Sequence, residues 1–401
     1  MKSEARKKFI DIVVNVTLLV LLFLPQSNIQ YVFFVGAMAT CVASNFRSVR
    51  IDWLKVAIVL SLLVTFLINA ATNADGYGMS SKSVVRCVMI MLMLVFFPFL
   101  KAHKIYPATI YVAIIYLLFS QLCYFFHLTP FWMYYDSVYP YNGEIYSYTS
   151  AYLSKQYMNF MVRFGGLYHN PNQCARAYTF LLAILLIEWK SLGTNTWKKV
   201  MLAMLFFGVL LTGSRTGLLA FLVMNAYYYY KNNDSVNKVR NVTVMALVGL
   251  VLLYFYSNIE IRSVKLSEGV DNSFGSKIGF LMDYLHEETS WLYVLFGHFN
   301  MDLSNVAHYI PFGTMDSEWG FAVFAFGVVF FVLLLIYYVK VAMNFRGEYA
   351  MLNFCLIWAV SGTILFSFSA SMTFFFMLSI YLGRIKEIEA GNGLGSAPAM
   401  R

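Results

Sequence analysis

Apolar runs long enough to cross a lipid bilayer recur along this chain of 401 residues. Residues 84–100 and 321–339, for example, hold one charged side chain between them. A membrane-spanning helix needs about 20 apolar residues, and a helix satisfies its own backbone hydrogen bonds inside the bilayer. The sequence therefore predicts an all-α, polytopic membrane protein.

Hydropathy along the whole chain predicts about twelve transmembrane helices. Charged residues make up 12% of the sequence, which is about half of what soluble domains carry. We expect residues 1–389 to form a single transmembrane domain and residues 390–401 to form a flexible cytoplasmic tail. The predicted spans lie near residues 9–25, 30–46, 53–71, 84–100, 105–126, 171–189, 197–213, 215–230, 241–257, 318–339, 349–366 and 368–383.

The distribution of charge predicts the orientation in the membrane. Most of the 29 Lys and Arg residues fall in the N-terminal segment and in alternate short loops, whereas the acidic residues favour the other side. The positive-inside rule then places both termini in the cytoplasm. The net charge of +9 is explained by this topology, so no nucleic-acid partner is expected.

The five cysteines are scattered and form no CxxC pair. No spacing of Cys and His resembles a zinc site, so neither a metal nor another cofactor is expected. Burial as small core hydrophobes is the main expectation for the cysteines. A disulfide between Cys123 and Cys174, both near the predicted outer face, is the alternative.

Two predicted outer loops are long, about residues 127–170 and about residues 258–317. Loops of this length are uncommon unless they are functional. The first is rich in Tyr and Trp. Such residues either form an interfacial belt at the membrane surface or stack against sugar rings, and both roles are compatible here.

A cluster of polar residues, GGLYHNPNQCARA at 165–177, precedes the sixth predicted span. Asn170 followed by Pro171 is typical of an N-cap and a first helical position, and Gln173 completes a variant of the capping box. Asn172 and Arg176 are four residues apart and share a helix face. Capping does not explain Arg176, because a cation near a helix N-terminus opposes the helix dipole.

The eighth predicted span begins in the same way, with TGSRTG at 212–217. Ser214 is the expected cap, and Arg215 lies in the first turn. Helix N-termini bind anions through free N–H groups, and arginine matches phosphate oxygens with two hydrogen bonds. With Arg163 just upstream, the pattern predicts a phosphate or diphosphate site at the outer membrane surface. Snorkelling of the arginines to lipid headgroups is the alternative.

These sequence motifs resemble those of a known superfamily. RFGGLYHNPNQCA, followed by LLTGSRTGLLAF and a large outer loop, resembles the bacterial O-antigen ligase and O-antigen/capsule polymerase (Wzy-type) superfamily over roughly residues 160–340. The resemblance implies a glycosyltransferase-C-like membrane fold and a metal-independent glycosyltransferase of the bacterial inner membrane that acts at the periplasmic face. It further implies undecaprenyl-diphosphate-linked oligosaccharides as substrates and a chain-length regulator as a further partner, besides the lipid bilayer.

The resemblance also assigns roles to residues. Arg215 would bind the diphosphate, and Lys277, in SFGSKIGFLMDYL, stands where the family carries a second arginine. Because lysine is a point charge rather than a bidentate fork, other arginines are possible substitutes in this role. These are Arg163, Arg176 and Arg262, while His169, Asn170 and Asn172 are candidates for other substrate contacts.

The stretch before the tenth span separates polymerases from ligases. Ligases usually carry a His-Asn pair there, whereas this chain has Asp316 and Glu318. The carboxylates favour a polymerase of lipid-linked repeat units, and His308 keeps the alternative of an O-antigen ligase open. Each of the three is a candidate for engaging the acceptor hydroxyl, although a carboxylate at a helix start is a weaker base. A flippase is less favoured, because the sequence contains no internal repeat.

Overall fold

The computed structural model describes several stretches of the chain and a few single positions between them. Every regular element among these residues is an α-helix, as the sequence predicts. The described residues are 2–24, 29–45, 52–72, 84, 88, 104–126, 128, 165–166, 168, 171–189, 192, 194–232, 239–240, 243, 247, 249, 282, 284–286, 290–299, 318–343, 376–377, 380–381 and 383–385.

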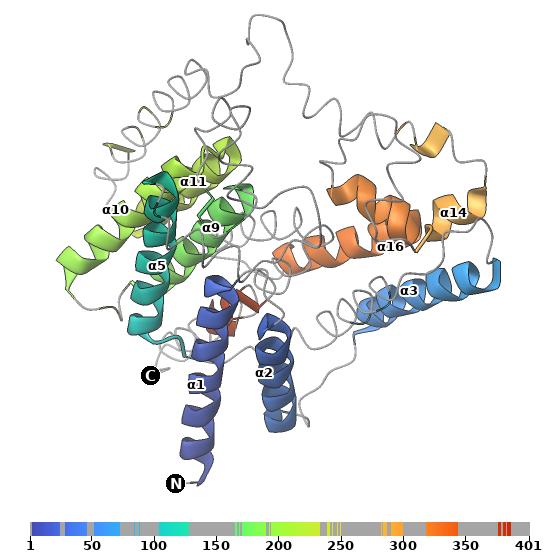
Figure 1. The fold of residues 1–401 in the computed structure, drawn as a ribbon, viewed down its shortest axis with the longest axis horizontal. Coiled ribbons are helices and arrows are strands. Elements are labelled where there is room, and N and C mark those ends of the chain that lie inside the picture. Colours follow the sequence, from blue (N-terminus) through green and yellow to red (C-terminus); the bar gives the residue numbers. More distant parts are fainter. Residues whose placement is uncertain are drawn as a thin grey trace, which may run out of the picture.

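Nine helices are labelled within these stretches (Figure 1). In chain order they are α1 (Lys2–Phe23), α2 (Ile29–Asn45), α3 (Trp53–Thr72), α5 (Pro107–Phe125), α9 (Pro171–Ile187), α10 (Asn195–Leu211), α11 (Arg215–Asn232), α14 (Trp291–Phe296) and α16 (Glu318–Met343).

The helices pack in two groups (Figure 1). In the first group α9 contacts α5, α10 and α11, and α5 in turn contacts α1, which packs on α2. In the second group α3, α14 and α16 each contact the other two. The first group holds both of the predicted helix starts with an arginine, so it positions the candidate site.

Buried polar side chains of α1 are hydrogen-bonded to the residues just before α5. Asp11 Oδ1 accepts the backbone N–H of Lys104 at 3.2 Å, and Asn15 Oδ1 accepts that of Tyr106 at 2.9 Å. Asn15 also donates from Nδ2 to the Lys104 carbonyl at 2.8 Å. Because buried polar groups are costly unless they are hydrogen-bonded, these bonds fix the register between α1 and α5.

Helices α3 and α16 run antiparallel over their whole contact. Lys340 Nζ lies 2.9 Å from Asp52 Oδ2 at one end, and the Thr65 hydroxyl donates to the Phe326 carbonyl at 3.4 Å further along. Helix α16 is not continuous, because Gly327 has φ 80° and ψ 169° and breaks it. The sequence does not predict this break.

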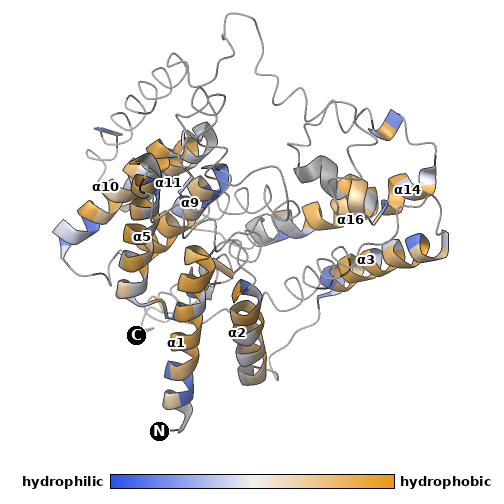
Figure 2. Ribbon diagram, in the orientation of Figure 1, coloured by the Kyte–Doolittle hydropathy of each residue, from blue (hydrophilic) through white to orange (hydrophobic). Residues whose placement is uncertain are grey.

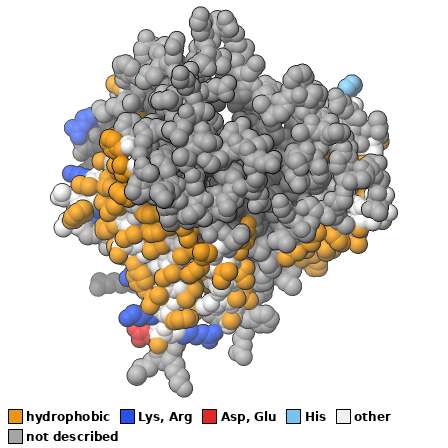
Figure 3. Space-filling model, viewed as in Figure 1, with side chains coloured by type: hydrophobic (Ala, Val, Ile, Leu, Met, Phe, Trp, Pro, Cys, Tyr) orange, Lys and Arg blue, Asp and Glu red, His pale blue; other side chains and the backbone are white. Residues whose placement is uncertain are grey.

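The outer surface of the bundle is apolar and its interior contains polar groups. Exposed large hydrophobic side chains line one face of α3, at Leu60, Leu63, Val64 and Leu67. On α5 the exposed residues are apolar, whereas Gln121 of the same helix is fully buried. Apolar ribbon colours prevail along these helices (Figure 2), and hydrophobic side chains make up most of the visible surface of the described helices (Figure 3). Such large exposed apolar patches mark a membrane or protein interface.

Within the described residues, α3 is the one helix both long and apolar enough to cross a membrane by length and composition. Four shorter apolar helical stretches, 29–43, 107–123, 172–187 and 323–337, also occur. All five coincide with predicted spans. The count of twelve spans and the bilayer crossing itself stay predictions.

Several predicted boundaries are confirmed, and one alternative is wrong. Helices begin at Pro171, Arg215 and Glu318, the residues predicted to open the sixth, eighth and tenth spans. Part of the second predicted loop packs against the helices, since α14 contacts both α3 and α16. The alternative of a disulfide between Cys123 and Cys174 is wrong, since both are buried free thiols.

Candidate anion site at two packed helix starts

The first turns of α9 and α11 are in direct contact. A Cβ atom at Gly217 would lie only 2.6 Å from the Cβ of Ala175, which is closer than two side chains can approach. Glycine at 217 therefore allows the two helix backbones to come together. Ala175 precedes Arg176 directly, and Gly217 lies two residues after Arg215. The structure thus brings the two helix starts side by side.

Ser214 caps the start of α11, as the sequence predicts. Its Oγ accepts the backbone N–H of Gly217 at 3.2 Å, and its carbonyl accepts that of Leu218 at 2.9 Å. The Thr212 hydroxyl in turn accepts the Ser214 N–H at 3.2 Å. Ser214 and Thr212 are both buried. The turn between α10 and α11 is therefore held by its own side chains.

The predicted site residues fall into three sets. Asn172 and Arg176 lie half-buried in the first turns of α9. Arg215 and Glu318 are the first residues of α11 and α16, and their backbones alone are described. The remaining candidates lie outside the described residues: Arg163, His169, Asn170, Arg262, Lys277, His308 and Asp316.

The segment before α9 packs on the end of α5. Gly166 has φ 59°, and a Cβ atom there would lie 2.5 Å from the Ser120 hydroxyl. Two residues later Tyr168 is fully buried, and its hydroxyl has no hydrogen-bond partner among the described residues. Burial raises the pKa of this phenol well above its ordinary value, and nearby Cys174 and Tyr116 add to the effect. The phenol is therefore neutral and retains a proton to donate.

Two buried hydrogen bonds form a polar bridge between the three helices α5, α9 and α10. The Tyr178 hydroxyl of α9 donates to Gln121 Oε1 of α5 at 2.7 Å, and Gln121 Nε2 donates to the Gly208 carbonyl of α10 at 3.2 Å. Such a bridge fixes the relative position of α5, α9 and α10, because breaking it leaves buried polar groups unpaired. Sequence analysis missed it, and the only signal was polar residues inside apolar spans.

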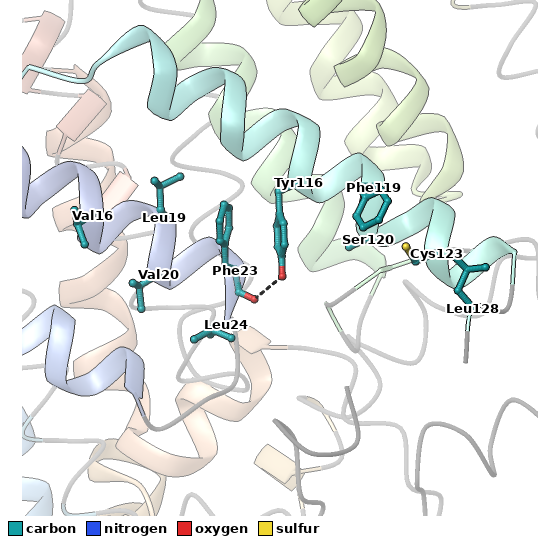
Figure 4. A pocket seen from close by; sticks show the side chains of 10 residues that line it. All are labelled: Val16, Leu19, Val20, Phe23, Leu24, Tyr116, Phe119, Ser120, Cys123 and Leu128. Atoms are coloured by element: carbon teal, nitrogen blue, oxygen red, sulfur yellow. Dashed lines mark hydrogen bonds between the residues drawn. The ribbon is translucent and has the colours of Figure 1, made fainter. Parts of the chain in front are cut away.

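An apolar cavity of about 730 Å³ lies between α1 and α5 (Figure 4). Its wall includes Val16 and Phe23 of α1 and Tyr116, Phe119 and Ser120 of α5. The rings of Phe23 and Tyr116 stack with centroids 3.8 Å apart. The Tyr116 hydroxyl donates to the Phe23 carbonyl at 3.4 Å, the dashed line in Figure 4.

A second arrangement, which the sequence analysis also missed, surrounds His298. Its ring stacks between Tyr293 (centroids 4.5 Å) and Phe324 (4.9 Å), with Tyr284 edge-on at 6.0 Å. The backbone N–H of His298 donates to the Phe324 carbonyl at 2.9 Å. The residue lies half-buried after α14. It belongs to the second predicted outer loop, and the sequence alone does not indicate which residues it contacts.

No group of three or more His, Cys, Asp or Glu side chains able to hold a metal ion occurs in the described part of the chain. The chemistry these residues offer is instead hydrogen bonding and helix-end electrostatics. Each helix N-terminus carries roughly half a positive charge and free N–H groups. Two adjacent starts with the same polarity therefore form a site suited to an anion with two charged centres.

No protein-family model, no curated protein and no solved structure matches this chain.

Proposed function

We propose that this protein is a polytopic membrane glycosyltransferase that joins undecaprenyl-diphosphate-linked oligosaccharide repeat units at the periplasmic face. The diphosphate of one unit binds at the paired starts of α9 and α11. The observation that carries the proposal is the contact between Ala175 and Gly217, because it adds the fields of two helix N-termini at one place. The resemblance of the sequence supplies the reaction.

The surface of the described helices supports a membrane location. Lipid-facing helices are apolar outside and place polar groups inside. The exposed apolar face of α3 and the buried bridge from Gln121 to Tyr178 follow this pattern. A soluble protein rarely exposes apolar patches of this extent.

The contacts between helix ends also support the predicted topology. Arg6 donates to the Ala43 carbonyl at 3.0 Å, Asp52 pairs with Lys340, and Glu188 pairs with Arg384. Each contact joins residues at or near the predicted cytoplasmic ends of spans. At the other ends, the Tyr293 hydroxyl donates to that of Thr72 at 3.2 Å, and both residues are predicted to lie outside. Both sets agree with alternating spans and cytoplasmic termini.

The proposed reaction requires a stabilised leaving group and a proton acceptor. The bond between the anomeric carbon and the diphosphate oxygen breaks, and the diphosphate leaves with the electron pair. A hydroxyl oxygen of the next unit forms a bond to that carbon and transfers its proton to a base. Arg215 and Arg176, with the helix N–H groups, stabilise the leaving diphosphate. Asp316, Glu318 or His308 accepts the proton.

The broken helix α16 is the one observation that favours a transporter, since discontinuous helices form the central sites of many transporters. The carbonyls exposed by the break are nevertheless occupied. Those of Phe324 and Ala325 accept the backbone N–H groups of His298 and Phe299 at 2.9 and 2.8 Å. The break is thus used for packing against the loop, and the enzyme remains the better proposal.

Replacing Arg215 with Ala in cells that lack the native copy tests the function. We expect surface polysaccharide with single repeat units in place of a ladder, because loss of one electrostatic contact to a leaving group slows such reactions about 10²- to 10³-fold. Arg240→Ala, at an exposed arginine, is the control and should leave the ladder unchanged.

The same gel distinguishes the classes of enzyme. Full-length but unattached polymer in the Arg215→Ala cells would assign the protein as a ligase. A normal ladder at normal protein abundance would overturn the role of Arg215.

A further inference from the structure

The cavity between α1 and α5 occupies the C-terminal halves of both helices. Its lining runs from Val16 to Leu24 on α1 and from Tyr116 to Leu128 at the end of α5. With the N-terminus in the cytoplasm, these halves lie in the outer leaflet. From Val16 to Phe23 the helix rises about 10 Å, which is most of one leaflet of a hydrocarbon core about 30 Å thick.

The chemistry of the lining selects an apolar ligand. None of its ten described residues is charged, and Ser120 and Tyr116 are the hydroxyl-bearing members. Both hydroxyls are already used, by bonds to the carbonyls of Leu117 and Phe23. The volume of about 730 Å³ lies within the range of about 300–1,000 Å³ that is typical of ligand pockets.

The cavity reaches the exposed apolar surface of α1 and α5, and one of its lining residues contacts the segment that precedes α9. Val16 and Phe119, which line it, are 43% and 60% exposed. Ser120, which also lines it, is in contact with Gly166, five residues before α9 begins at Pro171. A ligand that enters from the bilayer and ends at the helix starts therefore has an apolar chain and an anionic head.

We propose that this cavity binds the isoprenoid chain of the polyprenyl diphosphate, next to its headgroup site. The inference rests on the proposed function, because that function supplies a lipid whose head lies at the outer surface and whose tail descends into the outer leaflet. The side chains of α1 and α5 then select the lipid carrier, whereas the helix starts bind its phosphates.

The test uses the full-length protein in nanodiscs of phosphatidylethanolamine and phosphatidylglycerol. The probe is a sugar-free polyprenyl phosphate that carries a photoreactive diazirine in its chain, and mass spectrometry maps the labelled peptides. We expect labelling of the C-terminal halves of α1 and α5, which excess undecaprenyl phosphate removes. A phosphatidylglycerol probe should instead label the exposed face of α3 as well, without competition.

A matched pair of substitutions sharpens the test. Val16 lines the cavity, whereas Val112 on α5 does not, and the two are 43% and 45% exposed. Val16→Trp should lower the competable labelling about ten-fold, because excluding only two or three methylene groups from the cavity has an effect of that size. Val112→Trp should leave it unchanged.

Equal competition by phosphatidylglycerol, equal labelling of α3 by the polyprenyl probe, or equal effects of the two substitutions would overturn the proposal. Its failure is distinguishable from failure of the proposed function. If Arg215→Ala abolishes the polysaccharide ladder while labelling is unspecific, the tail site alone is wrong. If the ladder survives Arg215→Ala while labelling at α1 and α5 is competable, the site stands and the diphosphate role is wrong.

Discussion

The α9–α11 pair and the α14–α16 pair each make a close contact at a glycine, but the two glycines act differently. Gly217 lies inside a continuous helix and only removes a side chain from the contact with Ala175. Gly327 has a positive φ and interrupts its helix, so that the backbone of α14 reaches the backbone of α16. The first contact presents two intact helix starts, whereas the second uses its exposed carbonyls for packing.

The contacts at Gly217 and Gly327 therefore serve different purposes. The first turn of a helix leaves backbone N–H groups without intrahelical partners, and two such turns lie side by side in the α9–α11 pair. At the break in α16 the loop after α14 supplies the missing hydrogen bonds. The α9–α11 pair is therefore suited to binding an anion, and the break in α16 to holding α14 and the residues just after it in place.

The largest expected effect is that of Gly327→Ala. A Cβ atom there would lie 2.2 Å from the Leu295 carbonyl oxygen, at a φ of 80°. We expect a loss of about 3 kcal/mol or more in the free energy of unfolding, from backbone strain and overpacking together. The measurement is the midpoint of thermal unfolding in detergent. Gly36→Ala on α2, where a Cβ would meet nothing within 4 Å, is the control and should be neutral or slightly stabilising.

Gly217→Ala should have the next largest effect, because the new methyl group overlaps with Ala175. We expect a loss of about 1–3 kcal/mol in the free energy of unfolding and a shorter polysaccharide ladder. The double variant Ala175→Gly, Gly217→Ala removes the methyl group that the new one would overlap. It should recover most of the lost stability and most of the lost ladder length. Strictly additive effects of the two substitutions would contradict the contact, since residues that touch are coupled.

How much of these two regions the sequence predicts depends on how local the determining contacts are. The starts of α9 and α11 at Pro171 and Arg215 follow from signals within a few residues, namely a proline at the first position and the Ser214 cap. Gly327 stands in an uninterrupted apolar run, and the residues that break the helix there, around Leu295, lie some thirty positions away. No local pattern contains that information.

The candidate site divides in the same way. Its anchors were predictable, because Arg176 and Arg215 follow recognisable helix starts. The contact between Ala175 and Gly217, the bridge from Tyr178 to Gln121 and the cavity beside Tyr116 were not, because each joins residues of separate helices. Small and polar residues inside apolar spans indicate that such contacts exist without indicating which residues form them.

Two buried tyrosines near the helix starts give a finer test, since the same substitution should affect them differently. Tyr178→Phe removes the hydrogen bond to Gln121 and should cost about 1 kcal/mol of unfolding free energy. Tyr168→Phe removes a buried hydroxyl without a partner among the described residues and should be neutral or stabilising for the same measurement. A large destabilisation by Tyr168→Phe would show that its hydroxyl has a partner, and a loss of polymer without destabilisation would make that partner the substrate.

The smallest expected effect concerns the ion pair between Asp52, just before α3, and Lys340, near the C-terminal end of α16. The hydrogen bond from Lys340 holds the pKa of Asp52 below its ordinary value of 3.8. The pair therefore stabilises the folded protein above about pH 4, and this stabilisation is lost as the pH falls through the folded pKa of Asp52. Because the side chains are 31% and 49% exposed, Asp52→Asn should cost only about 0.2–1 kcal/mol.

The measurement is the difference in unfolding midpoint between the wild type and Asp52→Asn from pH 7 to pH 3, with Glu4→Gln, at an exposed acid of α1, as the control. The difference should shrink below about pH 4 and also with added salt, since exposed pairs are screened. A difference as large as that of Gly327→Ala would contradict the comparison. It would mean that the packing around α16 depends on the ion pair with Asp52 as much as on the backbone contact with α14 at the break.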